Sequence, residues 1–238
     1  METRRTQTSS EDPRLAPAYT VAEAAHYLRM PEPTLRSWVK GRDYPVAGGS
    51  RRSTGLIRLD DPRKRYLSFF NLVEAHVLAA IRRKHGVHLS NVRRALQYVR
   101  SECGIERPLI HQDFQTDGMD LFVEHYGDLI NASRDGQRAM KEILGAYLKR
   151  IERDAQGLPI KLYPFVRGSA AETAPASDPR VVVINPAVSF GRPVIKGTGI
   201  PVASIYERYK AGDSIAELAE GFRLKTSEIE EAIRCEAA

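Results

Sequence analysis

The sequence contains few of the residues from which disulfide frameworks and zinc sites are built. Its 238 residues include two cysteines, Cys103 and Cys235, which lie far apart and outside any Cys-x-x-Cys or Cys/His spacing. A disulfide scaffold or a zinc finger needs several such residues at short spacing. We therefore expect a cytoplasmic protein that folds without a structural metal and without a cofactor.

Long apolar stretches and catalytic motifs are missing as well. No run of about 18 apolar residues occurs, and the first residues lack the apolar core of a signal peptide. The motifs G-x-S-x-G, G-x-x-x-x-G-K-S and H-E-x-x-H are absent, and no nucleophile and base stand at a recognisable spacing. We expect a protein that does not enter a membrane, and we predict no catalytic residues and no enzyme activity.

Positive charge is concentrated towards the N-terminal part of the chain. The formal net charge is +6. Residues 29–65 contain ten Lys or Arg against four Asp or Glu, whereas residues 181–238 contain seven against eight. Most charge clusters are solvated surface, but a basic cluster beside a helix-turn-helix pattern favours a polyanion such as double-stranded DNA as a partner.

Such a helix-turn-helix pattern overlaps the basic stretch. Thr20 and Glu23 form a capping box, and the apolar residues that follow have the i, i+3, i+4, i+7 spacing of a buried helix face. Pro33 suits the first turn of a second helix, in which Leu35 and Trp38 would face the core. The residues on the opposite face, which we predict to contact DNA, are Thr34, Arg36, Ser37 and Lys40.

Residues 43–60 are rich in glycine and arginine and predict a β-hairpin wing, which would lie on DNA phosphates. The predicted phosphate-binding residues are Arg51, Arg52 and Arg58. Residues 20–41 resemble the N-terminal module of MerR-like or excisionase-like winged-helix DNA binders. Two departures are that Trp38 stands where MerR-like chains often have tyrosine, and that no effector-site cysteines follow.

Two longer helices are predicted after the wing, in the order that MerR-like proteins share. The first begins at Ser68 or Asn71, carries apolar residues at helical spacing, and ends at Gly86. The second is capped by Ser90 and ends at Gly104.

The apolar period then changes from helical to alternating over residues 109–125. The Asp-Gly pair at 117–118 is typical of a type I′ hairpin turn. Asp135 is predicted to cap a helix that extends to Ile151, and residues 160–166 have the composition of a further strand. We predict a small antiparallel sheet packed on a helix.

Glycine and proline recur along residues 190–202, whose sequence is FGRPVIKGTGIPV. Glycine accepts positive φ without steric cost and proline fixes φ, so the segment predicts two tight turns around short β-prone stretches. Three short helices follow in the prediction: the second opens with a capping box of Ser214 and Glu217, and the third is capped by Thr226 or Ser227. The pattern is that of a hairpin followed by a helix-turn-helix.

Residues 181–233, about a quarter of the chain, resemble the antitoxin-associated domain of unknown function that is found beside PIN-domain toxins. Its pattern is Gly, then Lys or Arg, then P-V-I-x-G-T-R-I-P-V. Gly199 stands where relatives usually have arginine, so any contact made by that arginine must be replaced here. The matching residues are Arg192, Pro193, Val194, Ile195, Gly197, Thr198, Ile200, Pro201 and Val202.

The resemblance implies a VapB-type antitoxin of a type II toxin–antitoxin pair. Such a protein binds and neutralises a PIN-like ribonuclease toxin and binds the operator DNA of its own operon. PIN-like nucleases hold Mg²⁺ with clustered carboxylates, which an antitoxin can cover or pair with cations. The predicted toxin-binding residues are Arg192, Lys196 and Arg234. The alternative is that these three are solvated and that the toxin contacts residues 109–166.

A second function remains open at this point. The chain could be a stand-alone MerR-like transcriptional regulator whose central sheet senses a small ligand, because both functions need DNA binding. In either case a homodimer is expected, since one helix-turn-helix reads only a half-site.

The predicted fold is mostly α with small β elements, an α+β chain. Its predicted parts are a disordered arm at residues 1–18, a winged helix-turn-helix domain at 19–104, a small antiparallel sheet with a helix at 105–167, a linker at 168–180 and an antitoxin-associated helix-turn-helix domain at 181–238.

Overall fold

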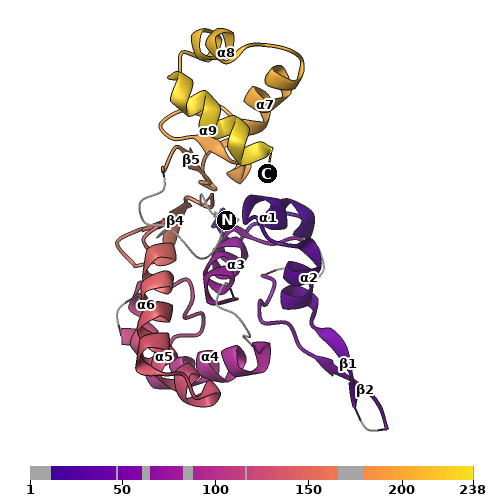
Figure 1. The fold of residues 1–238 in the computed structure, drawn as a ribbon, viewed down its shortest axis with the longest axis vertical. Helices are drawn as coiled ribbons and strands as arrows, with labels where there is room; N and C mark the ends of the chain where they lie inside the picture. The colour runs from indigo at the N-terminus through magenta and orange to yellow at the C-terminus, as the bar shows by residue number, and fades with distance from the viewer. Residues whose placement is uncertain are drawn as a thin grey trace, which may run out of the picture.

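The computed structural model describes residues 12–46, 48–60, 65–82, 88–115, 117–165 and 179–237. Its helices build most of the fold, and the described strands form three separate two-stranded antiparallel sheets. The predicted fold class, mostly α with small β elements, is therefore confirmed. Figure 1 shows a helical body with a β-hairpin projecting from one end and a C-terminal domain packed at the other.

The N-terminal elements follow the predicted order. Thr20 and Glu23 form the predicted capping box at the start of the first helix, and Gly41 ends the second. The two strands after Gly41 form an antiparallel hairpin, as predicted for the wing. These elements are α1 (Val21–Tyr27), α2 (Glu32–Lys40), β1 (Arg42–Val46) and β2 (Gly49–Ser53).

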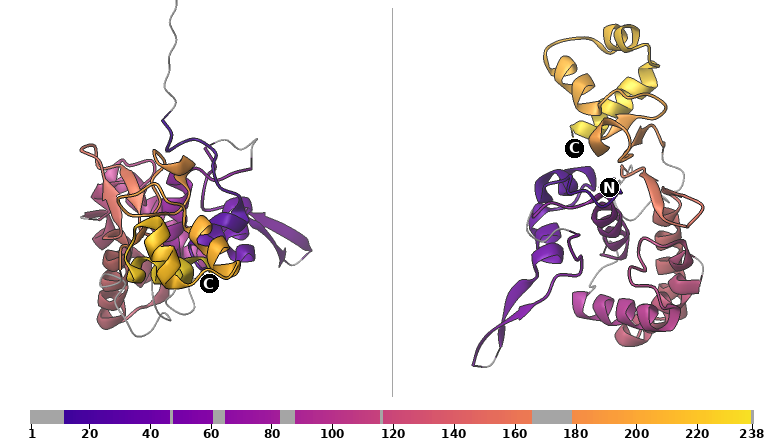
Figure 2. Two further views of the ribbon diagram at one scale, coloured as in Figure 1. Left: turned by 90° about the horizontal axis from the view of Figure 1, so that it is seen from above. Right: turned by 180° about the vertical axis from the view of Figure 1, so that it is seen from behind.

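Helix α3 (Phe69–Arg82) is the centre of the molecule. Nearly all of its residues are buried, because α1 and α2 cover one side of it and α6 (Arg134–Leu148) packs against another (Figures 1 and 2). Its first turn is closed by Ser68, whose Oγ accepts a hydrogen bond from the amide of Asn71 at 3.1 Å. The predicted end at Gly86 lies outside the described residues.

Helix α4 (Leu89–Cys103) ends as predicted, at Gly104 in the left-handed conformation with φ 66°. Its N-cap is His88 rather than the predicted Ser90. Both Ser90 and the true cap lie within one helical turn, so the local pattern located the helix and misplaced its first residue.

The predicted hairpin at residues 109–125 is wrong, because residues 117–130 form helix α5 (Asp117–Ile130). Met119, Phe122, Val123 and Tyr126 have i, i+3, i+4, i+7 spacing and are buried against the other helices. Asp117 sits in the first turn of this helix, where a negative charge is favourable. Tertiary packing of one apolar face therefore overrides the turn preference of the Asp-Gly pair.

Helix α6 is capped by Ser133, whose Oγ accepts from the amide of Gly136 at 3.1 Å, and not by the predicted Asp135. The helix ends before Ile151, which opens β3 (Ile151–Arg153) instead. Strand β3 pairs with β4 (Pro159–Leu162), the predicted strand in shortened form. The central region is thus an α-helical pair, α5 and α6, with one small hairpin.

The C-terminal domain has the predicted hairpin and three short helices. The capping box of Ser214 and Glu217 is present, whereas the last helix is capped by Lys225 rather than by Thr226 or Ser227. The elements are β5 (Val182–Val183), β6 (Val194–Ile195), α7 (Val202–Lys210), α8 (Ile215–Phe222) and α9 (Thr226–Glu236).

The C-terminal domain is docked on the helical body through backbone and side-chain bonds. Leu162 and Ile184 exchange two backbone hydrogen bonds of 2.9 and 2.8 Å. The guanidinium of Arg150, which is 1% exposed, donates to the carbonyl oxygens of Tyr163 and Phe165 at 2.7 and 2.6 Å and to that of Pro179 at 3.3 Å. Of the predicted linker, residues 168–178 lie outside the described part of the chain.

The predicted disordered arm is wrong for its last residues, whereas residues 1–11 lie outside the described part. Arg14 forms an ion pair of 2.5 Å with Asp154, and its guanidinium lies over the ring of Phe70.

Within the described residues, none of the helices combines the length and apolar character that a membrane crossing needs.

Candidate nucleic-acid interface

Helix α2 is fixed by its buried face and by prolines at its start. Pro31 occupies the N-cap with extended backbone, and Pro33 lies in the first turn, where a missing amide hydrogen costs nothing. Leu35 and Trp38 are 0% and 1% exposed and anchor the helix in the core. The rotation of α2 about its axis is therefore set, which determines the face that it presents to solvent.

Two of the four predicted DNA-contacting residues on α2 point outward. Arg36 and Lys40 are exposed and lie four positions apart on the same face. Glu32 forms an ion pair with Arg36 one turn earlier, which orients the guanidinium along the helix. Because the pair is open to solvent, it is weak, and a phosphate or a base edge can replace the carboxylate.

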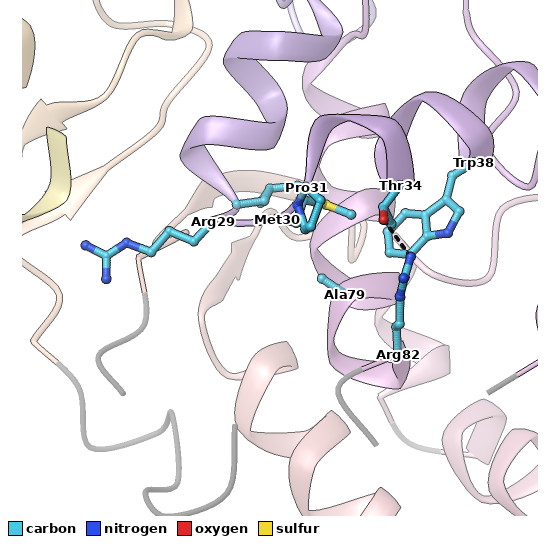
Figure 3. A pocket seen from close by; sticks show the side chains of 8 residues that line it. Arg29, Met30, Pro31, Thr34, Trp38, Ala79 and Arg82 are labelled. Carbon is cyan, nitrogen blue, oxygen red and sulfur yellow. Dashed lines mark hydrogen bonds between the residues drawn. The ribbon is translucent and has the colours of Figure 1, made fainter. Parts of the chain in front are cut away.

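Thr34 is a correction, because it is buried rather than outward-facing. It is 9% exposed, and its Oγ1 accepts a hydrogen bond of 2.8 Å from Nη1 of Arg82 on α3 (Figure 3). Ser37 is half-buried, and its hydroxyl donates to the carbonyl oxygen of Thr34 at 2.7 Å. Both hydroxyls are thus engaged within the protein.

The wing carries Arg51 and Arg52 in exposed positions on β2. In the antiparallel register Arg51 faces Tyr44 and Arg52 faces Asp43. Nη2 of Arg52 donates to the carbonyl oxygen of Lys40 at 3.3 Å, at the C-terminal end of α2 where carbonyl groups lack helical partners. The hairpin is thereby tied to the C-terminal end of α2, and we call the exposed cations of the two elements, Arg36, Lys40, Arg51 and Arg52, the basic surface.

The base of the wing is closely packed against α2. Gly41 has φ 74°, and a Cβ atom there would lie 1.8 Å from the carbonyl oxygen of Ser53. A Cβ atom at Gly55 would lie 2.3 Å from the carbonyl oxygen of Val39. Side chains are excluded at both positions, so the two glycines allow the hairpin to cross directly behind the helix end.

Three further arginines surround this surface. Arg58 is exposed as predicted, but it follows the hairpin, and its carbonyl oxygen accepts a hydrogen bond of 2.9 Å from Asn71 on α3. Nη2 of Arg93 donates to the carbonyl oxygen of Thr54 at 2.5 Å and supports the wing from α4. The exposed Arg42, which the sequence interpretation did not single out, is the first residue of β1; its position directly after Gly41 was the available signal.

A pocket of about 220 Å³ lies behind α2, between the α1–α2 turn and α3 (Figure 3). The indole Nε1 of Trp38 is buried, and among the described residues it has no hydrogen-bond partner. The pocket is not in the central region, where a ligand site was predicted for a sensing regulator. Its lining residues are Leu28, Arg29, Met30, Pro31, Thr34, Trp38, Ala79 and Arg82.

The predicted toxin-binding residues separate into two groups. Arg192 and Lys196 flank β6 and are exposed; the ammonium group of Lys196 lies 5.6 Å from the centre of the Tyr163 ring. Arg234 does not lie in a tail, as predicted, but in α9, where its Nη1 forms a 2.8 Å ion pair with Glu231. Because Glu231 is 4% exposed, Arg234 neutralises a buried carboxylate of its own domain.

Arg192 lies close to the winged domain. Burial raises the pKa of Tyr27 to about 12, and the positive charge of Arg192 acts in the opposite direction on the same hydroxyl. Nearby, Nη2 of Arg29 donates to the carbonyl oxygen of Arg234 at 2.9 Å, and the Tyr19 hydroxyl donates to that of Gly191. The residues just before and just after α1 are therefore in direct contact with the C-terminal domain.

No group of three or more His, Cys, Asp or Glu side chains within the described residues is arranged to hold a metal ion. The site's chemistry is instead that of arginine and lysine side chains on a helix and a hairpin, both rigidly attached to one core. This combination defines a winged helix-turn-helix module of the DNA-binding class.

Comparisons with known proteins agree with this class. Residues 17–96 match the family model described as "Putative DNA-binding HTH domain", and residues 182–234 match "Protein of unknown function (DUF433)". The chain is 30% identical over 239 aligned positions to "Putative antitoxin VapB45" of Mycobacterium tuberculosis, covering 93% of this chain and 95% of the relative.

A solved structure has the same fold along nearly the whole chain. The crystal structure of Rv2018 from Mycobacterium tuberculosis superposes with a TM-score of 0.64 at 24% sequence identity, over 92% of this chain and 98% of the other. Together with the curated relative, this agreement extends from the winged domain to the C-terminal domain. The chain belongs to the VapB45 antitoxin family and carries a DNA-binding helix-turn-helix domain.

Proposed function

We propose that this chain neutralises a PIN-like ribonuclease toxin and represses its own operon by binding operator DNA. The observation that carries the proposal is the presence, on one chain, of an exposed basic wing and recognition helix together with the C-terminal domain of an antitoxin family. The protein acts by binding and not by catalysis.

The DNA-binding half rests on the geometry of α2 and the wing. A helix of this diameter fits the major groove, where Arg36 can donate two hydrogen bonds to a guanine edge and Lys40 can follow the backbone. Arg51 and Arg52 on the projecting hairpin reach the phosphates beside that groove, with Arg58 at its edge. Thr34 is left out of this surface, because its hydroxyl is bonded to Arg82.

Two copies of the chain would bind one operator. One recognition helix covers a half-site, and a symmetric pair covers two half-sites about one helical turn apart. We therefore propose a homodimer on DNA, with each copy supplying one α2 and one wing. Protein with a mass of two chains bound to a single operator fragment is the expected result.

The toxin-binding half rests on the exposed cations of the C-terminal domain. Arg192 and Lys196 lie at the ends of the β6 segment, whose backbone is held by turns, so their charge is presented with little further loss of entropy. Arg234 is left out, because its guanidinium already pairs with the buried Glu231. The proposed partner is a nuclease whose metal-binding carboxylates complement these two cations.

Co-purification tests the toxin-binding half. The product of the adjacent reading frame, expressed with the full-length chain, is expected to co-purify with it and to lose its ribonuclease activity. Replacing Arg192 and Lys196 together by glutamate should release the toxin, whereas the matched control Lys210→Glu on the exposed side of α7 should not. Toxin bound equally by the wild type and the double variant would contradict the assignment to these cations.

The pocket behind α2 favours a second candidate function, a regulator that senses a small ligand. A molecule bound in this pocket would contact Thr34 and Trp38 of the recognition helix directly. Trp38 is the single tryptophan of the chain, so the emission of this lining residue is not mixed with that of another tryptophan. A saturable change in its emission, accompanied by a change in operator affinity, would support the sensing function.

A further inference from the structure

Phe190 is by far the most exposed large apolar residue in the described part of the chain. It is 95% exposed, whereas the other exposed large hydrophobic residues range from 36% to 43%. Keeping a whole phenyl ring in water is unfavourable, and its burial against a partner recovers that free energy. Aromatic residues of this kind are the ones that dominate protein–protein contacts.

The backbone that carries Phe190 is held in an uncommon conformation. Ser189, Phe190 and Gly191 have φ values of 48°, 54° and 76°, so three successive residues are left-handed. This conformation is unfavourable for residues with a Cβ atom, and it persists only where surrounding contacts impose it. Strain of this kind is concentrated at functional sites.

Contacts on both sides impose this conformation. Oγ of Ser189 donates to the carbonyl oxygen of Gly199 at 3.1 Å, and the Tyr19 hydroxyl donates to the carbonyl oxygen of Gly191 at 2.9 Å. The amide of Gly191 donates to the carbonyl oxygen of Val188 at 2.9 Å. The loop is therefore fastened to the C-terminal hairpin and to the winged domain, and the ring projects from a rigid base.

The charges beside the ring indicate the kind of partner. Arg192 and Lys196 are exposed and follow Phe190 within six positions of the chain. A second copy of the chain is a poor occupant, because a symmetric contact centred on Phe190 would bring Arg192 towards its own copy, and the whole chain carries a net charge of +6. A surface with an apolar hollow bordered by carboxylates is complementary in both shape and charge.

We propose that Phe190 is the apolar anchor of the toxin contact: its ring fills a hollow of the nuclease beside the metal-binding carboxylates, which Arg192 and Lys196 pair with. This inference rests on the proposed function and assigns its main contact to an uncharged residue. Because the loop is already rigid, binding loses little entropy at this position.

The variants Phe190→Gly and Phe190→Asn test the anchor without disturbing the fold. Both residues accept the left-handed conformation more readily than phenylalanine, so the melting temperature should stay unchanged or rise. The probe is the purified product of the adjacent reading frame, with one candidate metal-binding Asp replaced by Asn. Its affinity for either variant should fall at least about 30-fold, as for a central interface aromatic.

Tyr209→Ala is the matched control, because Tyr209 is an exposed aromatic residue of the same domain at 42% exposure. Its affinity for the toxin should equal that of the wild type. Wild-type chain that fails to bind the product at all would overturn the proposed function together with the anchor. Wild-type binding that both Phe190 variants retain would overturn the anchor alone.

Three other results would also overturn the anchor. Lower melting temperatures for both variants would mean that the ring has a structural role. Weaker operator binding with unchanged toxin affinity would assign Phe190 to DNA. A loss of the homodimer with unchanged toxin affinity would assign it to a second copy of the chain.

Discussion

Arg36 and Thr34 lie two positions apart on α2 and have opposite environments. The period of the helix places Arg36 on the solvent side, and that much could be read from the spacing of Leu35 and Trp38. Thr34 is buried because Arg82, 48 positions later in the chain, reaches its hydroxyl. A contact of this range leaves no mark on the local pattern.

Arg36→Ala should reduce sequence preference more than total affinity. A bidentate contact with a base edge contributes about 1 to 3 kcal/mol of discrimination, whereas the remaining arginines still bind any phosphate backbone. The measurement is the ratio of operator affinity to random-DNA affinity at fixed salt. Arg94→Ala, an exposed arginine on α4, is the control and should leave the ratio unchanged. If Arg36→Ala leaves the ratio of operator affinity to random-DNA affinity unchanged, base recognition must belong to other residues.

Phe190 shows a second reason why the environment of a single residue is hard to predict from the sequence. The glycine and proline pattern around it predicted tight turns, and the turns are present. Which residue a tight turn projects into solvent depends on contacts with Tyr19, far away in the chain. Gly199 lies in the same glycine-rich segment, but its φ is ordinary and a Cβ atom there would meet nothing within 4 Å, so the backbone does not require glycine at this position.

At the scale of elements, those with strong local signals were predicted well. The capping boxes of α1 and α8, the glycine after α4 and the wing hairpin follow from interactions within a few residues. Helix α5 was not predicted, because its Asp-Gly start is ambiguous until the helices that cover its apolar face are in place. Local sequence patterns are enough to predict an element where packing does not oppose them. Where it does, tertiary packing determines the secondary structure.

Gly41→Ala should displace the wing. A Cβ atom at this position would lie 1.8 Å from the carbonyl oxygen of Ser53 on a backbone with φ 74°, so the variant should lose at least about 1 kcal/mol of stability and bind operator more weakly. Thermal unfolding and DNA titration measure the two effects. Gly199→Ala, which has open space and ordinary φ, should match the wild type in both. An intact DNA affinity in Gly41→Ala would show that the wing is dispensable.

At the scale of the whole molecule, Arg150 holds the ends of the two segments that lead from the helical body to the C-terminal domain. Arg150→Met would leave the carbonyl oxygens of Tyr163, Phe165 and Pro179 without this donor in a buried place. We expect a loss of about 3 kcal/mol in the free energy of unfolding, measured by urea denaturation. Arg138→Met, an exposed arginine on α6, should change it by less than about 0.5 kcal/mol. Equal stability of both variants would contradict the role of Arg150.

The same junction should respond to acid through Glu152. Hydrogen bonds from Lys161 and Tyr163 lower the pKa of this carboxyl below its ordinary value of 4.5. A lowered folded-state pKa stabilises the protein at higher pH, and the contribution disappears as pH falls below 4.5 towards the folded value. Because the side chain is one-third exposed, the contribution is below about 1 kcal/mol.

The variant Glu152→Gln isolates this contribution from the other carboxylates. It should be less stable than the wild type at pH 7, and the difference in unfolding free energy should shrink as pH falls below 4.5. Unfolding curves of both proteins across this range measure the difference. A difference that stays constant with pH would mean that Glu152 stabilises the junction by packing and not by charge.

The most direct test of the account is the salt dependence of operator binding. Each phosphate contact adds about 0.9 to the slope of log affinity against log salt, so Arg51→Ala with Arg52→Ala should flatten the slope by about two. The control pair Arg94→Ala with Arg138→Ala removes the same charge from other exposed positions and should leave the slope as in the wild type. A slope that is unchanged by the wing pair would contradict DNA binding by this winged helix-turn-helix.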